Sequence, residues 1–69
     1  MKLTKSDINL IEKNANARLA SMHPEQRPPV AELPGQRIQS VAYGAKESFE
    51  CTTTNGHVVW RTAEQVAAL

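Results

Sequence analysis

The side chains of this chain that are best suited to covalent or metal chemistry are one cysteine and two histidines, Cys51, His57 and His23. Cys51 and His57 both lie in the stretch FECTTTNGHVVWRT, which therefore holds the two residue types of a nucleophile–base pair. Side chains alternate along a β-strand, and the hairpin predicted below sends Cys51 to one face and His57 to the other. We expect Cys51 to be a buried structural residue, and no catalytic residue is assigned.

Metal and cofactor sites are not predicted either. One cysteine and two histidines do not supply four ligands at a recognised spacing. The three glycines, Gly35, Gly44 and Gly56, stand apart from one another, so the sequence has no glycine-rich loop for a phosphate group. The acidic residues are dispersed as well. We expect a protein that is not an enzyme and that has no cofactor.

Size and composition favour association with another protein. The chain has 69 residues, of which 41% are hydrophobic, and its net charge is +1. Nine of the apolar residues are alanines, which leave a thin core, and small domains often gain stability from a disulfide, a metal or a partner subunit. The single cysteine excludes an internal disulfide and suits a reducing compartment. We expect a homodimer.

The sequence predicts neither a membrane span nor a secretory signal. No apolar run approaches the length that a transmembrane helix needs. Asp7 stands where the apolar core of a signal peptide would lie. The expected location is the cytoplasm, with no membrane partner.

The N-terminal segment predicts a helix over about residues 4–22. Thr4 and Asp7 have the spacing of a capping box, and Leu3 and Ile8 have that of the surrounding hydrophobic staple. Pro24 ends the helix, because the residue before a proline is driven out of the helical region. The four prolines that begin there predict a stiff linker over residues 23–36. One apolar stripe at helical spacing is expected to face the core: Ile8, Ile11, Ala15, Leu19 and Met22.

Three antiparallel strands are predicted over about residues 37–43, 48–54 and 57–62. Asn55-Gly56 is the preferred pair for a two-residue type I′ turn between the last two strands. That turn places Cys51 opposite Trp60, and it pairs Glu50 with Arg61 as an ion pair on the outer face. The core-facing side chains of this hairpin are then Phe49, Cys51, Val58 and Trp60.

The first hairpin allows two registers. A four-residue loop over residues 44–47 turns Ile38 and Ala42 toward the core, and this is the register that we favour. A three-residue loop turns Val41 and Tyr43 inward instead.

Thr62 and Gln65 form a second capping box, which predicts a short helix over residues 63–69. The predicted fold class is therefore α+β in a single domain, residues 1–69. Its order is an N-terminal helix, a Pro-rich linker, a three-stranded antiparallel β-sheet and a short C-terminal helix.

The favoured registers leave aromatic and apolar residues on the outer face of the sheet, which predicts a protein-binding surface there. Tyr43 and Arg61 are the expected anchors, and Arg27 is a secondary candidate held out from the body by the stiff linker. Leu10 and Ala17, on the outer side of the first helix, are the predicted dimer interface. The remaining members of the predicted partner-binding set are Arg37, His57, Val41 and Val59.

The alternative function is that of a small nucleic-acid-binding regulator. Arg37, Arg61 and Tyr43 on one sheet face would contact phosphates and stack a base. Glu50 lies among them, however, and the chain has no basic excess. A module that binds and inhibits or modulates another protein is the preferred prediction.

In its size and overall make-up the chain resembles the small accessory proteins that bacteriophages encode to bind and inhibit a host protein. The resemblance covers no aligned residues, so it assigns no site. It implies a short, cytoplasmic, non-enzymatic protein, often dimeric, whose partner is a host protein such as a transcription regulator, an RNA polymerase or a motor ATPase.

Overall fold

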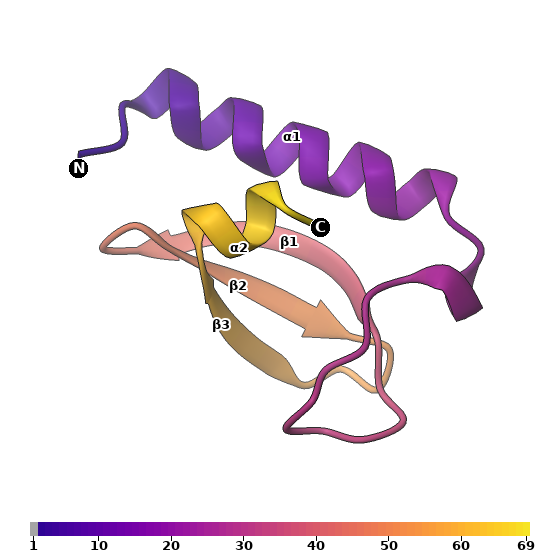
Figure 1. Cartoon of the computed structure of the whole chain (residues 1–69). Helices are drawn as coiled ribbons and strands as arrows, with labels where there is room; N and C mark the ends of the chain where they lie inside the picture. Colours follow the sequence, from indigo (N-terminus) through magenta and orange to yellow (C-terminus); the bar gives the residue numbers. More distant parts are fainter. Residues whose placement is uncertain (1) are drawn as a thin grey trace.

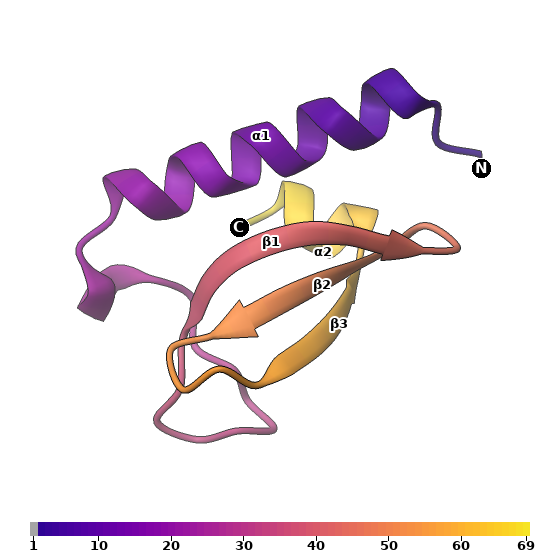
Figure 2. The same cartoon turned by 180° about the vertical axis from the view of Figure 1, so that it is seen from behind.

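A helix, a three-stranded antiparallel sheet and a short second helix follow one another in the computed structural model, which describes residues 2–69 (Figure 1). The strand order is β1-β2-β3, so strands adjacent in sequence are paired. Both helices lie on the same side of the sheet: α1 packs along β1, and α2 packs against α1, β2 and β3 (Figures 1 and 2). The predicted α+β fold is confirmed. The elements are α1 (Lys5–Ser21), the 3₁₀ turn η1 (Pro24–Gln26), β1 (Ile38–Ala45), β2 (Ser48–Thr53), β3 (Val58–Thr62) and α2 (Ala63–Ala67).

Helix α1 begins as the sequence predicts. Thr4 Oγ1 accepts a hydrogen bond from the amide of Asp7 at 3.1 Å, and Asp7 Oδ2 accepts one from the amide of Thr4 at 3.2 Å. These two bonds satisfy amides that have no partner within the helix. In the predicted stripe Leu19 is buried together with Ala15, while Ile8 and its neighbour Ile11 pack against the core from its margin.

The proline-rich segment is more structured than a stiff connector. After η1 the chain runs beside the start of β1, and an isolated bridge joins Pro29 to Arg37. The amide of Val30 donates to the carbonyl of Gln36 at 2.9 Å, and the amide of Ile38 donates to the carbonyl of Pro28 at 3.0 Å. Val30 is buried in the core. The segment is therefore a loop fixed to the sheet at both of its ends.

The register predicted for the β2–β3 hairpin is wrong by one residue. Cys51 lies opposite Val59 and Glu50 lies opposite Trp60. The loop has three residues rather than two, since the amide of Thr53 donates to the carbonyl of His57 at 2.7 Å and only Gly56 has a positive φ, of 84°. This is the geometry of a type I turn followed by a bulge at glycine. Because a one-residue slip exchanges the two faces of a strand, β3 turns its other side to the core.

The β1–β2 hairpin also differs from the favoured prediction. Its turn residues are Lys46 and Glu47, both at positive φ (51° and 62°), as a type I′ turn requires. Irregularities in the pairing around Gln39 and Gly44 shift the register of β1 along its length. Ile38 faces the core as predicted, but Ala42 lies on the outer face. The alternative prediction, in which Val41 and Tyr43 face inward, is the one observed.

The core lies between the inner face of the sheet and the two helices. Phe49 and Cys51 of β2 are fully buried, as predicted, and Val66 reaches them from α2. The capping box at the start of α2 is also confirmed, because Thr62 Oγ1 accepts from the amide of Gln65 at 3.2 Å. The buried apolar residues among residues 2–69 are Ala15, Leu19, Val30, Ile38, Val41, Phe49, Cys51, Val59 and Val66.

Candidate protein-binding face

The sheet presents its second face, here called the outer face, without a covering helix (Figure 2). Trp60 and Val58 dominate this face, with 53% and 48% of their surfaces exposed. Among residues 2–69 they are two of the three exposed large hydrophobic residues, and they are near neighbours on one strand. The outer face consists of Ser40, Ala42 and Gly44 from β1, Glu50 and Thr52 from β2, and Val58 and Trp60 from β3.

The ring of Trp60 lies across the sheet rather than standing away from it. Trp60 is opposite Glu50 on β2, yet its nearest neighbour on β1 is Gly44. A Cβ at position 44 would overlap two carbons of the Trp60 ring, and it would lie 3.3 Å from Cγ of Glu50. The absence of a side chain at Gly44 therefore lets the indole extend across β2 and reach β1. The result is a broad aromatic surface held in a defined orientation.

Glu50 is the one charged residue of the outer face. Its predicted partner, Arg61, is opposite Phe49 and so belongs to the other face of β3. The Arg61 guanidinium forms an ion pair with Glu32 in the loop before β1, and it donates to the carbonyl of Trp60 at 2.8 Å. The hydrogen bond from Arg61 holds the pKa of Glu32 below its usual value. The predicted Glu50–Arg61 ion pair is therefore wrong.

The edge of the sheet at β1 is covered by polar side chains of α1. Asn16 uses both atoms of its amide on Val41: Nδ2 donates to the carbonyl at 2.7 Å, and Oδ1 accepts from the amide at 2.9 Å. Glu12 Oε2 accepts from the amide of Tyr43 at 3.1 Å. These contacts replace the hydrogen bonds that a further strand would make, so the β1 edge is not open to strand pairing.

The edge at β3 is open by comparison. The amide and carbonyl of Thr53 turn toward β3, because its amide bonds to His57. Alternation along the ladder directs the backbone of Val59 and Arg61 toward β2, and that of Val58 and Trp60 away from the sheet. Outside the β2–β3 ladder, no hydrogen bond within residues 2–69 involves the amide or carbonyl of Val58 or the amide of Trp60, and the carbonyl of Trp60 is bonded by Arg61.

Several predicted partner-binding residues occupy other places than expected. Val41 and Val59 are core residues with 3% and 8% of their surfaces exposed. The observed registers of both hairpins differ from the favoured predictions and turn these two side chains to the inner face. Tyr43 also faces inward, where its ring meets Phe49 edge-on at a centroid distance of 5.4 Å. Its hydroxyl accepts from the amide of Glu47 at 3.2 Å and so supports the β1–β2 turn. The placement of these three residues on the outer face was wrong.

The predicted rim residues are separated as well. Arg27 does not protrude: it is half-buried, and its Nε donates to the carbonyl of Leu19 at 3.1 Å. Arg37 donates from Nη1 to the carbonyl of Arg27 at 2.6 Å, so both arginines fasten the linker to the fold. His57 is exposed beside the β2–β3 loop. These contacts are structural, and they do not form one surface with Trp60.

The two residues predicted for a dimer interface are exposed on α1. Leu10 has 57% of its surface exposed, and Ala17 lies two turns further along the helix, also exposed. Small and polar residues surround them, so Leu10 is the one large hydrophobic residue of that surface. It presents less apolar area than the outer face of the sheet does.

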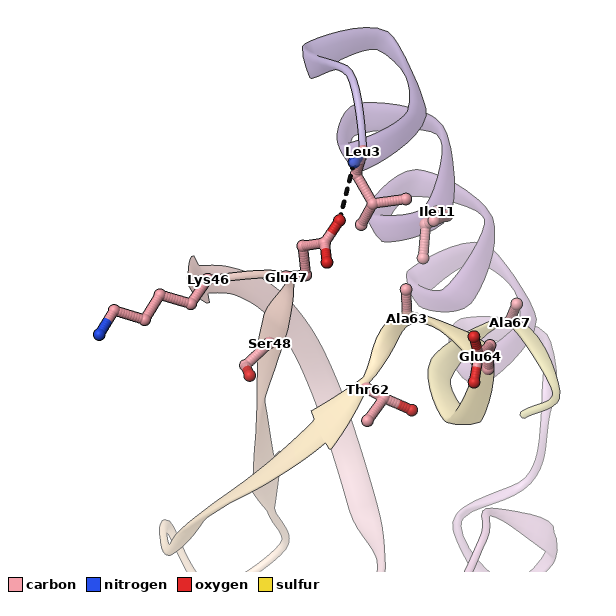
Figure 3. Close-up of a pocket in the computed structure, with 9 residues that line it drawn as sticks. All are labelled: Leu3, Ile11, Lys46, Glu47, Ser48, Thr62, Ala63, Glu64 and Ala67. Carbon is pink, nitrogen blue, oxygen red and sulfur yellow. Dashed lines mark hydrogen bonds between the residues drawn. The ribbon is translucent and has the colours of Figure 1, made fainter. Parts of the chain in front are cut away.

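A shallow groove of about 430 Å³ lies at the far end of the first hairpin (Figure 3). Leu3 and Ile11 form one apolar wall, and Ala63 and Ala67 approach them from the start and end of α2. The amide of Leu3 donates to Glu47 Oε1 at 2.9 Å across the groove. This bond ties the N-terminal segment to the strained turn. The side chain of Lys46 points away from the groove in Figure 3.

The chemical groups considered first in the sequence do not come together. Cys51 is fully buried in the core, as predicted, and its burial raises the pKa of its thiol. His57 is exposed. Among residues 2–69 no three His, Cys, Asp or Glu side chains are grouped so as to hold a metal ion.

Sequence reasoning missed the functions of Gly44, Asn16 and Glu12. The signal for Gly44 was present, since glycine inside a strand often marks a bulge or a close approach. Asn16 and Glu12 gave no comparable signal, because polar residues on a helix are ordinarily solvent-exposed. In the part of the chain that the structure describes, no helix has the length and apolar character needed to cross a membrane. No protein-family model, no curated protein and no solved structure matches this chain.

Proposed function

We propose that this chain is a non-enzymatic interaction module that binds another protein through the outer face of its sheet and blocks the surface that it covers. The observation that carries the proposal is the orientation of Trp60, which lies over Gly44 with half of its surface exposed. Tryptophan is enriched among the residues that dominate binding energies. A ring that is already held against the sheet loses little conformational freedom when a partner docks on it.

The neighbours of Trp60 define the kind of partner surface. Val58 extends the apolar area on the same strand, while Thr52 and Ser40 offer hydroxyl groups at the margin. Glu50, beside the aromatic ring, favours a basic residue of the partner, which would contact the carboxylate and the ring face together. We therefore propose an apolar partner patch that contains one arginine or lysine.

The test compares two substitutions that remove similar exposed apolar residues from different surfaces. Wild type, Trp60→Ala and Leu10→Ala are immobilised separately and exposed to an extract of the cells that produce the chain. A protein that wild type and Leu10→Ala retain, and that Trp60→Ala releases, is then purified and titrated. We expect Trp60→Ala to weaken binding by at least ~30-fold, which corresponds to a hot-spot loss of ~2 kcal/mol.

Two results would contradict the proposal. Equal retention of every captured protein by wild type and Trp60→Ala would exclude the outer face as the binding surface. Captured nucleic acid whose affinity falls steeply with salt would instead support the alternative function. The outer face is poorly suited to that alternative, since its one charged residue is acidic.

A further inference from the structure

The open edge of β3 suggests how copies of this chain associate. The edge offers two donors, the amides of Val58 and Trp60, and two acceptors, the carbonyls of the same residues. Alternation along the β2–β3 ladder leaves three of these four groups unpaired within residues 2–69, and the fourth is bonded by the Arg61 side chain. Unpaired backbone groups in a row are a template for another strand.

We propose that β3 pairs with β3 of a second copy in antiparallel orientation, with Val58 opposite Trp60 of the second copy. The two-fold axis passes beside Val59. In this register the amide of Val58 donates to the carbonyl of Trp60 in the second copy, and the amide of Trp60 donates to the carbonyl of Val58. The symmetry repeats both bonds, so all four groups of each edge are satisfied. A self-complementary patch of this kind is what a two-fold dimer requires.

The side chains support the same register. Val58 and Trp60 both point to the outer face, so the pairing places each valine next to the Cβ of a tryptophan whose ring extends the other way, toward Gly44. The register therefore does not require the Trp60 ring to move. No charged side chain follows Val58 and Trp60 on this row of β3, so the pairing creates no like-charge repulsion there.

One existing contact must change when the strands pair. The guanidinium of Arg61 occupies the carbonyl of Trp60, which the second copy needs. Arg61 keeps its ion pair with Glu32 when it leaves that carbonyl, so no charge is left without a partner. In the monomer Arg61, paired with Glu32, therefore occupies the Trp60 carbonyl at the β3 edge. In the proposed dimer Arg61 and Glu32 remain paired with each other.

The other edge of the sheet stops the assembly at two copies. Asn16 and Glu12 of α1 already bond the backbone of β1, so a third copy finds no open edge there. The product is an open six-stranded sheet with a β1 strand at each end, to which no further copy can be added.

The outer face of one copy has a footprint on the order of 250 Å², from three strands of about five residues. A standard interface uses about 800 Å² per partner, so joining two faces brings the surface closer to a usable size.

The dimer is expected to be weak. The exposed parts of Val58 and Trp60 amount to on the order of 200 Å² per copy, which belongs to the class of small, transient interfaces. Association should therefore depend on concentration over the micromolar range rather than persist on dilution. This inference does not depend on which partner the outer face binds.

Hydrogen exchange at single amides provides the decisive measurement, because the chain contains its own controls. The amides of Val58 and Trp60 point outward, whereas those of Val59 and Arg61 bond to β2. Between about 10 µM and about 1 mM, exchange at Val58 and Trp60 should slow by at least tenfold, while exchange at Val59 and Arg61 should stay slow throughout. Sedimentation over the same range should show a rise from 7.6 kDa toward twice that mass.

Two matched variants test the strand pairing itself. Val58→Pro removes one outward amide at the first residue of an edge strand, where proline is tolerated, and should keep the chain monomeric and folded. Val58→Thr keeps the amide and the β-branched shape, and should still dimerise. If Val58→Pro fails to fold, a cross-linking experiment replaces it. Chains carrying Val58→Cys and chains carrying Trp60→Cys are mixed and oxidised, and a disulfide should form between the two kinds of chain and not between two Val58→Cys chains.

Three results would overturn the proposal. One is a species of 7.6 kDa at every concentration up to about 1 mM. Another is a dimer that Leu10→Asp disrupts and Val58→Pro leaves intact, which would place the interface on α1. The third is a cross-link between two Trp60→Cys chains alone, which would indicate another register. Sedimentation and hydrogen exchange use the chain alone, so their outcome is independent of whether the outer face binds a partner.

Discussion

The contact between Trp60 and Gly44 can be tested by adding one carbon atom. Gly44→Ala should lower the free energy of unfolding by about 1–2 kcal/mol, because the new Cβ overlaps the Trp60 ring and forces it off the sheet. Gly44 is not among the residues with positive φ, so alanine is otherwise compatible with the backbone there. The cost arises from the ring alone.

The magnitude follows from the burial of Trp60. The ring is 53% exposed, so contacts within the chain cover about half of a side chain that can bury about 150–250 Å². At about 25 cal/mol per Å², the covered area of about 100 Å² contributes roughly 2.5 kcal/mol as an upper limit. A displaced ring keeps part of its contact with Glu50, which reduces the expected loss to about 1–2 kcal/mol.

A double-mutant cycle separates this effect from any other consequence of the new methyl group. In the Trp60→Ala background nothing overlaps the Cβ, and Gly44→Ala should stabilise by about 0.4–1 kcal/mol through the unfolded state. The sign of the Gly44→Ala effect therefore reverses between the two backgrounds. The coupling energy between the two positions should reach about 2 kcal/mol, within the range known for residues in contact.

Urea unfolding followed by circular dichroism measures all four members of the cycle. Trp60 is the only tryptophan, so its fluorescence reports the position of the ring directly. Gly44→Ala should shift the emission to longer wavelength, because the displaced indole is more exposed to water. Additive free energies, or an emission maximum identical to that of wild type, would show that the ring does not lie over Gly44.

Three further predictions use other parts of the structure. Lys46→Gly should stabilise by about 0.5–1 kcal/mol and Gly56→Ala should destabilise by more than ~1 kcal/mol in thermal melts, since both positions have positive φ; equal effects of the same sign would contradict the assigned turns. Asn16→Ala should cost about 1–3 kcal/mol because it leaves both backbone groups of Val41 unpaired, whereas Asn14→Ala, on the exposed surface, should change stability by less than ~0.5 kcal/mol. Burial raises the pKa of Cys51 above the usual thiol value of 9.0, so the unfolded chain loses the thiol proton at a lower pH than the folded chain does. The free energy of unfolding should therefore decline as pH rises above 9.0, and Cys51→Ala should remove that part of the decline.

The order and type of the elements were predictable because the signals for them are local. Two capping boxes, at Thr4 and Thr62, mark where each helix begins, and both are observed. Pro24 correctly ended α1. Phe49 and Cys51 were assigned to the core from alternation alone, and they are fully buried. None of these predictions needs a long-range contact.

The hairpin registers were not predictable from local signals. Asn55-Gly56 suits a two-residue turn, but Gly56 also suits the left-handed position that closes a three-residue loop. In the observed register Val59 is buried in the same core cluster as Val66, and Trp60 is exposed. The observed register therefore places Trp60 on the surface instead of in the predicted core. The candidate binding face accordingly consists of residues that the sequence had assigned to the inner side of β3.

The β1–β2 turn carried no sequence signal at all, because neither lysine nor glutamate favours positive φ. Contacts from distant residues hold it instead. The hydroxyl of Tyr43 accepts from the amide of Glu47, and the Glu47 carboxylate accepts from the amide of Leu3. A conformation that local preference opposes persists where the surrounding structure over-determines it. Reading it from the sequence would have required knowing that the N-terminal segment passes this turn.

The two edges of the sheet determine what an exposed tryptophan can do in this fold. A small sheet with both edges open and an apolar face would add copies without limit, because each new copy would present the same edge again. Helix α1 removes one edge by placing Asn16 and Glu12 on the backbone of β1, which leaves β3 as the edge at which a strand can be added. Polar residues that looked like ordinary helix surface in the sequence thus close one edge of the sheet. Under the proposed β3–β3 pairing they limit the assembly to two copies, and Trp60 stays exposed on the outer face for the proposed partner.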